Sequence, residues 1–173
     1  MGKDEFLFLI PGVLYGIGIF DLLSLVRNKE NYWENLLWAT VMFFTLIALL
    51  FDFYEDLGKL TSNILYYTLF IFSPLFFVQS CCLISPDEKE RDMKAHFDSN
   101  RRHFFISMTG VVLVNVLIQL LVTNKFHLVQ SILIVSSFSL NVFFDKLYLR
   151  LIAAALITIF VLRFYIENAA VFT

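Results

Sequence analysis

The stretch SPDEKERDMKAHFDSNRRH, residues 85–103, is the longest polar segment of the sequence. Three apolar runs precede it and three follow it, each long enough or nearly long enough to cross a bilayer. A soluble domain of 173 residues has too little interior to bury a sequence that is 59% hydrophobic and contains 21 phenylalanines. The mean hydropathy of +0.76 points the same way. The sequence therefore predicts two hydrophobic halves in a membrane, joined by one charged segment.

The six apolar runs define the predicted fold. Each has roughly the 17–25 residues that a hydrocarbon core of about 30 Å requires, and a helix satisfies its own backbone at that depth. We expect an all-α integral membrane protein with one domain over residues 1–173. It should have about six transmembrane helices, and a short cytosolic helix between the third and the fourth. The expected spans are residues 6–26, 36–53, 64–84, 104–122, 126–144 and 149–166, of which the fifth is the most polar.

The distribution of lysine and arginine predicts the orientation. Nine of the 13 lie in the connections after the first, third and fifth runs, and the other four lie on the opposite side. Cytoplasmic loops carry the excess of positive charge. We therefore expect residues 85–103 to face the cytosol, both termini to lie outside, and the membrane to be a bacterial inner membrane. Aromatic residues near the run ends, among them Trp33 and Trp38, are typical of the belts at membrane interfaces.

The start of the central segment carries the signals of a helix N-terminus. Ser85 is a good N-cap, Pro86 suits the first helical position, and Glu88 completes a capping box. These residues predict a short helix over 86–97 and a break at 98–100 before the next membrane helix. The segment is either a solvated connector whose arginines fix the topology or a docking surface for a cytosolic protein. The docking residues would be Glu90, Arg91, Met93, Lys94, Phe97, Arg101 and Arg102.

The first run combines a proline with small residues. Pro11 removes a backbone hydrogen bond, and Gly12 and Gly16 form a GxxxG pattern that we expect Gly18 to extend. Such a face lets another helix approach closely. The contact would lie within the protomer or between subunits of a homo-oligomer, and a hinge at Pro11 is the third alternative.

Polar side chains inside the runs are candidate functional groups. Asn115 lies near mid-membrane, and Gln119, four residues later, shares its helix face. They are either hydrogen-bonding contacts between helices or part of a polar stripe along a cavity, together with Gln130 and Asn141. Asp21 is an ionisable group near the cytosolic end of the first run, which makes it a further candidate.

The sequence offers little for catalysis or cofactor binding. It has no HExxH, CxxC or glycine-rich phosphate motif, and its two cysteines are adjacent. A net charge of −2 leaves no nucleic-acid footprint. We therefore expect a protein that is not an enzyme, with no cofactor, no metal and no nucleic-acid partner.

Two functions fit these observations. The first is a non-enzymatic, homo-oligomeric membrane subunit that works with a soluble cytosolic protein as a sensor, an anchor or a pore-forming effector, for example in bacterial antiviral defence. The second is a small transporter, or the substrate-binding membrane subunit of one. In size and phenylalanine content the chain is similar to substrate-binding subunits of vitamin transporters, to cell-shape accessory proteins and to membrane subunits of antiviral systems.

Overall fold

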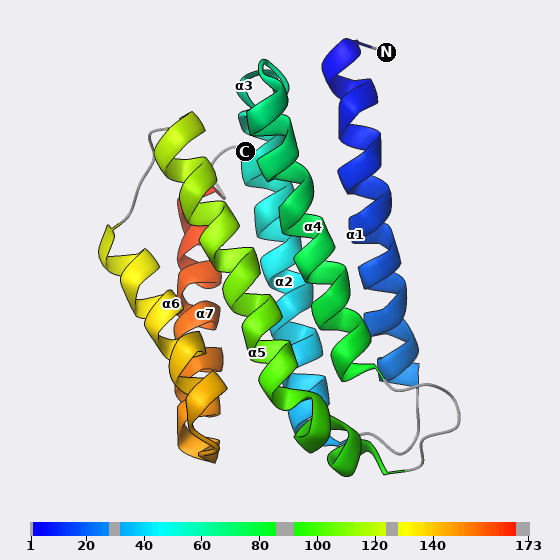
Figure 1. Ribbon diagram of the computed structural model, residues 1–173, viewed down its shortest axis with the longest axis vertical. Helices are drawn as coiled ribbons and strands as arrows, with labels where there is room; N and C mark the ends of the chain where they lie inside the picture. The colour runs from blue at the N-terminus through cyan, green and yellow to red at the C-terminus, as the bar shows by residue number, and fades with distance from the viewer. Residues whose placement is uncertain (1, 28–31, 86–91, 124–127, 169–173) are drawn as a thin grey trace.

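The fold was obtained as a computed structural model, which describes residues 2–27, 32–85, 92–123 and 128–168. The described residues are almost entirely helical (Figure 1). The elements are α1 (Lys3–Arg27), α2 (Trp33–Glu55), α3 (Leu57–Leu60), α4 (Ile64–Ile84), α5 (Met93–Ile118), the π-helix η1 (Gln119–Thr123), α6 (Leu128–Phe143) and α7 (Leu147–Asn168).

Five helices are long and apolar enough to cross a membrane: α1, α2, α4, α5 with its continuation into η1, and α7. This finding supports the prediction of a multipass membrane protein. The fifth predicted span, residues 126–144, corresponds to α6, which has only 16 residues. At 1.5 Å per residue it is about 24 Å long, less than the thickness of a typical hydrocarbon core. The predicted count of six spans is therefore not confirmed.

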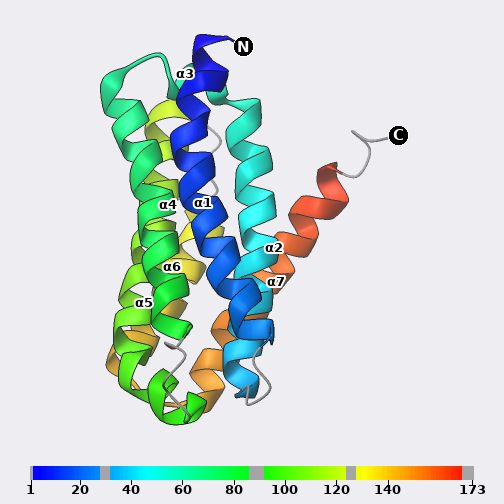
Figure 2. The same cartoon turned by 90° about the vertical axis from the view of Figure 1, so that its right-hand side faces the viewer.

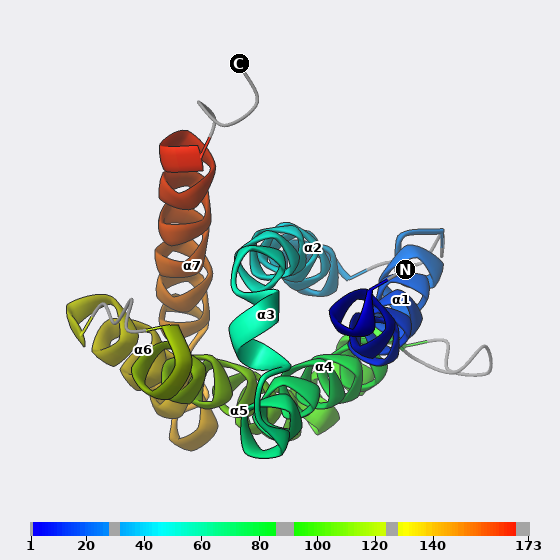
Figure 3. The same cartoon turned by 90° about the horizontal axis from the view of Figure 1, so that it is seen from above.

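The helices form an arc around α2. Seen from above, α1, α4, α5, α6 and α7 follow one another along the arc, and α2 lies on its inner side (Figure 3). The start of α1 and the short α3 lie at one end of the bundle, which we name the α3 end (Figures 1 and 2). The start of α2, the start of α5 and the α6–α7 connection lie at the other end, which we name the Arg150 end.

The predicted break at residues 98–100 is wrong. Helix α5 begins at Met93 and runs without interruption into the apolar part of the chain. Its N-cap is Asp92, whose side chain accepts hydrogen bonds from the backbone N–H groups of Lys94 and Ala95. The polar residues that suggested a break bond within the helix instead, because the Ser99 hydroxyl donates to the His96 carbonyl.

The short cytosolic helix is likewise not confirmed. Ser85, the predicted N-cap, lies at the C-terminus of α4, and its N–H donates to the Cys81 carbonyl. Residues 86–91, which include Glu90 and Arg91, lie outside the described part of the chain. From Met93 onwards the predicted short helix is the first part of α5.

Met93 and Phe97 are buried within the protomer, with exposed fractions of 3% and 0%. The Phe97 ring packs against Tyr32 and Phe104 at centroid distances of 6.1 and 6.2 Å. Because α5 is continuous, the apolar face that carries Met93 and Phe97 turns towards the core together with Phe104. Neither side chain can form the apolar docking edge that we predicted from the sequence.

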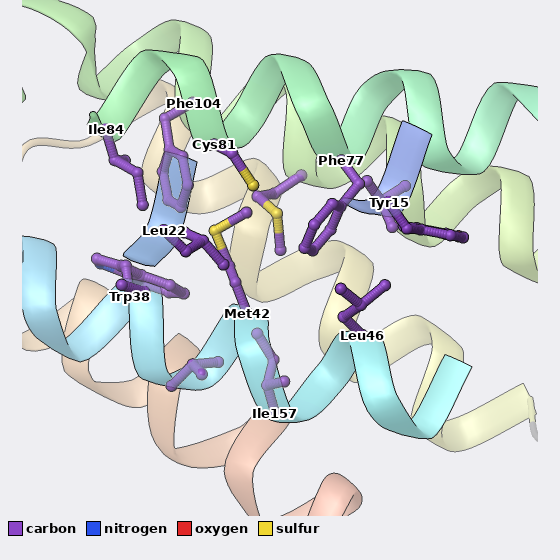
Figure 4. Packing of buried hydrophobic residues seen from close by; sticks show 14 of the residues in the cluster. Tyr15, Leu22, Trp38, Met42, Leu46, Phe77, Cys81, Ile84, Phe104 and Ile157 are labelled. Atoms are coloured by element: carbon purple, nitrogen blue, oxygen red, sulfur yellow. The ribbon is translucent and has the colours of Figure 1, made fainter. Parts of the chain in front are cut away.

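The interior is a layer of large side chains that α2 and α4 share with the helices around them. Figure 4 shows Trp38, Met42 and Leu46 of α2 pointing into the same buried layer as Phe77 and Cys81 of α4. Interfaces inside membranes are stabilised mainly by close packing, because lipid tails are as apolar as the side chains. The tight aromatic packing around Trp38 is therefore a main source of stability.

Helix α1 continues through Pro11. A proline lacks the N–H that would bond the carbonyl four residues earlier, which here is that of Leu7. The Tyr67 hydroxyl of α4 donates to this carbonyl at 2.9 Å. The neighbouring helix thus satisfies the group that Pro11 leaves without its usual donor, as membrane helices require.

The glycines of α1 do not share one face. An added Cβ at Gly18 would lie 2.8 Å from the Phe77 ring of α4, whereas nothing lies within 4 Å of one at Gly12 or Gly16. At about 100° per residue, Gly18 is turned by about 200° from Gly16. The expectation that Gly18 extends the GxxxG face is therefore wrong. Gly18 provides the close α1–α4 contact, and no described residue of the protomer covers the GxxxG pair.

We expect Gly18→Leu to lower the stability of the protomer by about 1–3 kcal/mol, because the new side chain overlaps a buried aromatic ring. Gly16→Leu, two residues away, should leave protomer stability within about 0.5 kcal/mol. Thermal unfolding of both variants in the same detergent measures the difference. Equal destabilisation by the two variants would contradict the packing of α1 on α4.

Candidate functional site

A pocket of about 240 Å³ lies between α2, α5, α6 and α7, in the half of the bundle towards the α3 end. Its deeper wall is apolar and includes Met108, Phe138 and Ile157. Pockets of this kind, with an apolar lining and a few polar groups, are the usual form of small-molecule sites in proteins.

Three of the four amides predicted to form a polar stripe line this pocket. Asn115 and Gln119 reach it from α5, and Gln130 reaches it from α6. Asn141 does not line it. Its amide N–H₂ group instead donates to the carbonyls of Ser137 at 2.8 Å and Leu149 at 3.2 Å, which ties α6 to the start of α7. The structure thus places Asn115, Gln119 and Gln130 together and assigns Asn141 to helix packing.

Gln119 is also the first residue of η1. The backbone there departs from regular α-helix geometry, and such π-turns inside helices are frequent at functional sites. Five residues of the pocket-lining helix therefore adopt an unusual backbone next to the amide side chains.

A chain of hydrogen bonds leads from the pocket into the core. The Tyr15 hydroxyl of α1 and the Ser73 hydroxyl of α4 are 3.0 Å apart, and Ser73 donates to Asn115 Oδ1 at 3.5 Å. Tyr15 and Ser73 are both buried. Polar groups inside a membrane need partners, and this chain connects the Asn115 amide at the pocket wall to polar groups in the core.

Charged side chains lie around the pocket at the α3 end. Asp52, Arg163 and Glu167 contribute to its lining. Arg163 and Glu167 form an exposed ion pair with Nε and Oε1 2.7 Å apart, one helical turn apart on α7. Exposed pairs of this type contribute little to stability, so these groups remain able to interact with a bound molecule.

A second polar cluster lies at the Arg150 end, between the same helices. Glu34 near the start of α2 and Arg150 near the start of α7 are 1% and 8% exposed. Arg150 Nε lies 3.0 Å from Glu34 Oε2, and Nη2 donates to Oε1 at 3.1 Å. The Nη2 contact is a charge-assisted hydrogen bond, whereas Nε and Oε2 are close enough for an ion pair but do not have hydrogen-bond geometry.

Asp145, in the α6–α7 connection, extends the cluster to α5. Its Oδ1 lies 3.1 Å from Arg150 Nη1 and 2.8 Å from Nη1 of Arg101 on α5. Arg101, which the sequence suggested for partner docking, is therefore engaged within the protomer. We name Glu34, Arg101, Asp145 and Arg150 the ion-pair cluster.

Tyr32 supports this cluster from the residue before α2. Its hydroxyl donates to Glu34 Oε1 at 2.7 Å. Burial raises the pKa of Tyr32 to about 12, and the hydrogen bond to Glu34 acts in the same direction. The phenol is therefore a neutral donor at every physiological pH.

Sequence reasoning missed Glu34 and Arg150. They are 116 residues apart, and no local pattern connects them. One signal was present: Arg150 lies in the first turn of the last helix, where a positive charge is unfavourable for the helix dipole. An arginine at such a position therefore suggests that a nearby carboxylate compensates its charge.

The remaining predicted residues lie apart from both features. Asp21 accepts a hydrogen bond from the Cys82 thiol, with 3.3 Å between Oδ2 and Sγ, and contacts α4 rather than the pocket. Lys94 and Arg102 are exposed at the Arg150 end. Gly12 and Gly16 lie on the outer side of α1.

No protein-family model, no curated protein and no solved structure matches the chain. The fold and the pocket alone therefore define its class, a multipass helical membrane protein with an amide-lined pocket between four of its helices.

Proposed function

We propose that the protein binds a small molecule in the pocket between α2, α5, α6 and α7, and that it is a non-enzymatic small transporter or the substrate-binding membrane subunit of one. The observation that carries the proposal is the convergence of Asn115, Gln119 and Gln130 on one pocket with an apolar deeper wall. These amides supply neutral donors and acceptors, whereas Met108, Phe138 and Ile157 supply apolar contact.

The lining favours a compact molecule with an apolar body and a few hydrogen-bonding groups. Its apolar part would lie against the deeper wall, and its polar part would face the amides and the charged groups at the α3 end. The excess of lysine and arginine in the connections at the Arg150 end supports an orientation with the α3 end outside a bacterial inner membrane, and the pocket would then face the exterior.

The alternative function, docking of a soluble cytosolic protein, has less support. Two of its predicted contact residues, Met93 and Phe97, are buried, and Arg101 is paired with Asp145. One feature still supports homo-oligomerisation: nothing in the protomer lies within 4 Å of an added Cβ at Gly12 or Gly16 of α1, so another subunit could pack there.

The test uses small molecules that co-purify with the protein. Wild type, Asn115→Leu and Thr109→Val are purified in mild detergent and denatured, and the released compounds are identified by mass spectrometry. Thr109 lies on the same helix outside the pocket lining, so its variant controls for loss of a polar group.

We expect one compound to be enriched with wild type and with Thr109→Val, and to be reduced about tenfold with Asn115→Leu. Without the Asn115 amide, a polar group of the ligand has no partner, which weakens binding by about 1.4 kcal/mol. Equal amounts in all three proteins contradict the proposal. The proposal is also contradicted if no compound is enriched with the wild-type protein.

A further inference from the structure

The pocket and the ion-pair cluster occupy opposite ends of one group of helices. Helices α2, α5, α6 and α7 line the pocket, and the cluster joins α2, α5 and the α6–α7 connection. We infer that the two form one path through the membrane, in which the ion-pair cluster is the closed gate at the Arg150 end. This inference rests on the proposed function and extends it from binding to translocation.

A continuous column of aromatic rings fills the space between the pocket and the cluster. Phe138 lines the pocket and packs on Trp38 at a centroid distance of 6.0 Å. Trp38 packs on Phe104 at 5.4 Å, and Phe104 packs on Phe97 at 6.2 Å. The Arg150 guanidinium lies over the Phe97 ring, 6.0 Å from its centroid. The bottom of the pocket and the ion-pair cluster are thus the two ends of one packed column.

The cluster fastens the α6–α7 hairpin to the rest of the bundle. Glu34–Arg150 joins α7 to α2, and Arg101–Asp145 joins the α6–α7 connection to α5. The third contact, Arg150–Asp145, lies within the hairpin and would survive its movement. Displacement of the hairpin therefore breaks the two outer contacts together and separates Phe138 from Trp38.

The chemistry of the cluster suits a contact that opens and closes. Burying an ion pair removes both charges from water, and this desolvation offsets most of the attraction between them. Opening towards the aqueous phase restores their hydration, so the change in free energy is small. A purely apolar seal would expose its surface to water with no such compensation.

A buried polar atom within the column supports the same interpretation. Trp38 Nε1 is buried and has no hydrogen-bond partner among the described residues. Buried groups of this kind are rare in native proteins and call for an explanation. In an open path this atom would face water, so the hydrated open state satisfies a group that the closed state leaves unpaired.

The test measures from which side a pocket residue can be reached. Thr45 of α2 lines the pocket, and Thr45→Cys places a thiol there in a Cys81→Ala, Cys82→Ala background. The membrane-impermeant reagent MTSET is added to spheroplasts and to inverted vesicles, which expose opposite ends. Ile47→Cys, on the outer face of the same helix, is the control for lipid exposure and should not react.

We expect Thr45→Cys to react from the α3 end only. Adding Arg150→Gln, which leaves the Glu34 carboxylate without its counter-charge while it is buried in the closed state, should raise the rate from the Arg150 end at least about tenfold. This is the population change that follows when the closed state alone loses about 1.4 kcal/mol. Arg102→Gln, which removes an exposed charge at the Arg150 end outside the ion-pair cluster, should leave that rate unchanged.

Asp145→Asn is a second variant that preserves folding, because the Asp145 side chain is 66% exposed. It releases Arg101 and should raise the same rate several-fold. If neither variant changes the rate from the Arg150 end by more than about twofold, the gate is wrong and the pocket proposal stands. If Thr45→Cys reacts from neither side, the pocket proposal falls together with the gate.

Discussion

Arg150→Met alone is expected to destabilise the protein by about 3–5 kcal/mol, because it leaves the buried Glu34 carboxylate without its counter-charge. Methionine preserves most of the side-chain volume, so the loss reports charge rather than packing. The measurement is reversible unfolding in mixed micelles, followed by the fluorescence of the two tryptophans.

The double variant Arg150→Met, Glu34→Gln separates the two contributions. Once both charges are removed, no unpaired charge is buried, and most of the lost stability should return. With Glu34→Gln alone, these variants complete a double-mutant cycle, and its non-additive part is the coupling energy between the two residues. If the double variant is no more stable than Arg150→Met, the pair does not act as a unit and the ion-pair cluster is not what holds α7 to α2.

The membrane-spanning architecture could be predicted because hydropathy reports it directly. Apolar runs of sufficient length correspond to α1, α2, α4, α5 and α7. The i,i+4 spacing of Asn115 and Gln119 also predicted that the two amides share a face, and both line the pocket. Signals of this type are local, since each depends only on residues within a few helical turns.

Features that depend on competition between local signals were predicted less well. Ser85 and Asp92 are both good N-cap residues, and α5 begins after the second. Which of the two residues caps the helix determines whether Met93 and Phe97 belong to a separate short helix or to α5. With α5 starting at Met93, their face continues into the buried face of the membrane helix, so the polar segment contributes to the core.

Features that depend on helix–helix geometry could not be predicted at all. The Glu34–Arg150 pair requires knowing that the starts of α2 and α7 are neighbours, and that adjacency arises from packing of the whole bundle. The same holds for the Tyr67 hydroxyl that bonds the Leu7 carbonyl, since the position of Pro11 predicts the need for a donor but not which helix supplies it.

The two tryptophans show the same limit. Both lie near the start of the second apolar run, and both were expected in an interfacial belt. Trp33 fits that expectation with an exposed fraction of 48%, whereas Trp38 is 0% exposed. Five residues correspond to about 500° around a helix, which turns the second tryptophan by about 140° from the first. The sequence therefore predicts how deep each tryptophan lies in the membrane, but it does not predict which face of α2 points into the bundle.

Trp38→Ala is therefore expected to be among the most damaging single substitutions, with a loss of about 3–5 kcal/mol, while Trp33→Ala should change stability by about 0.5 kcal/mol or less. Transfer of an indole between the protein interior and lipid is close to neutral, so the loss comes from packing with Phe104, Phe105 and Phe138. Thermal unfolding in one detergent compares the two variants, and each retains one tryptophan whose emission maximum reports its surroundings. Trp33→Ala should keep the short-wavelength emission of a buried indole, and Trp38→Ala should lose it. A Trp38→Ala protein as stable as Trp33→Ala would show that the aromatic column is loosely packed, and would remove the seal between the pocket and the ion-pair cluster.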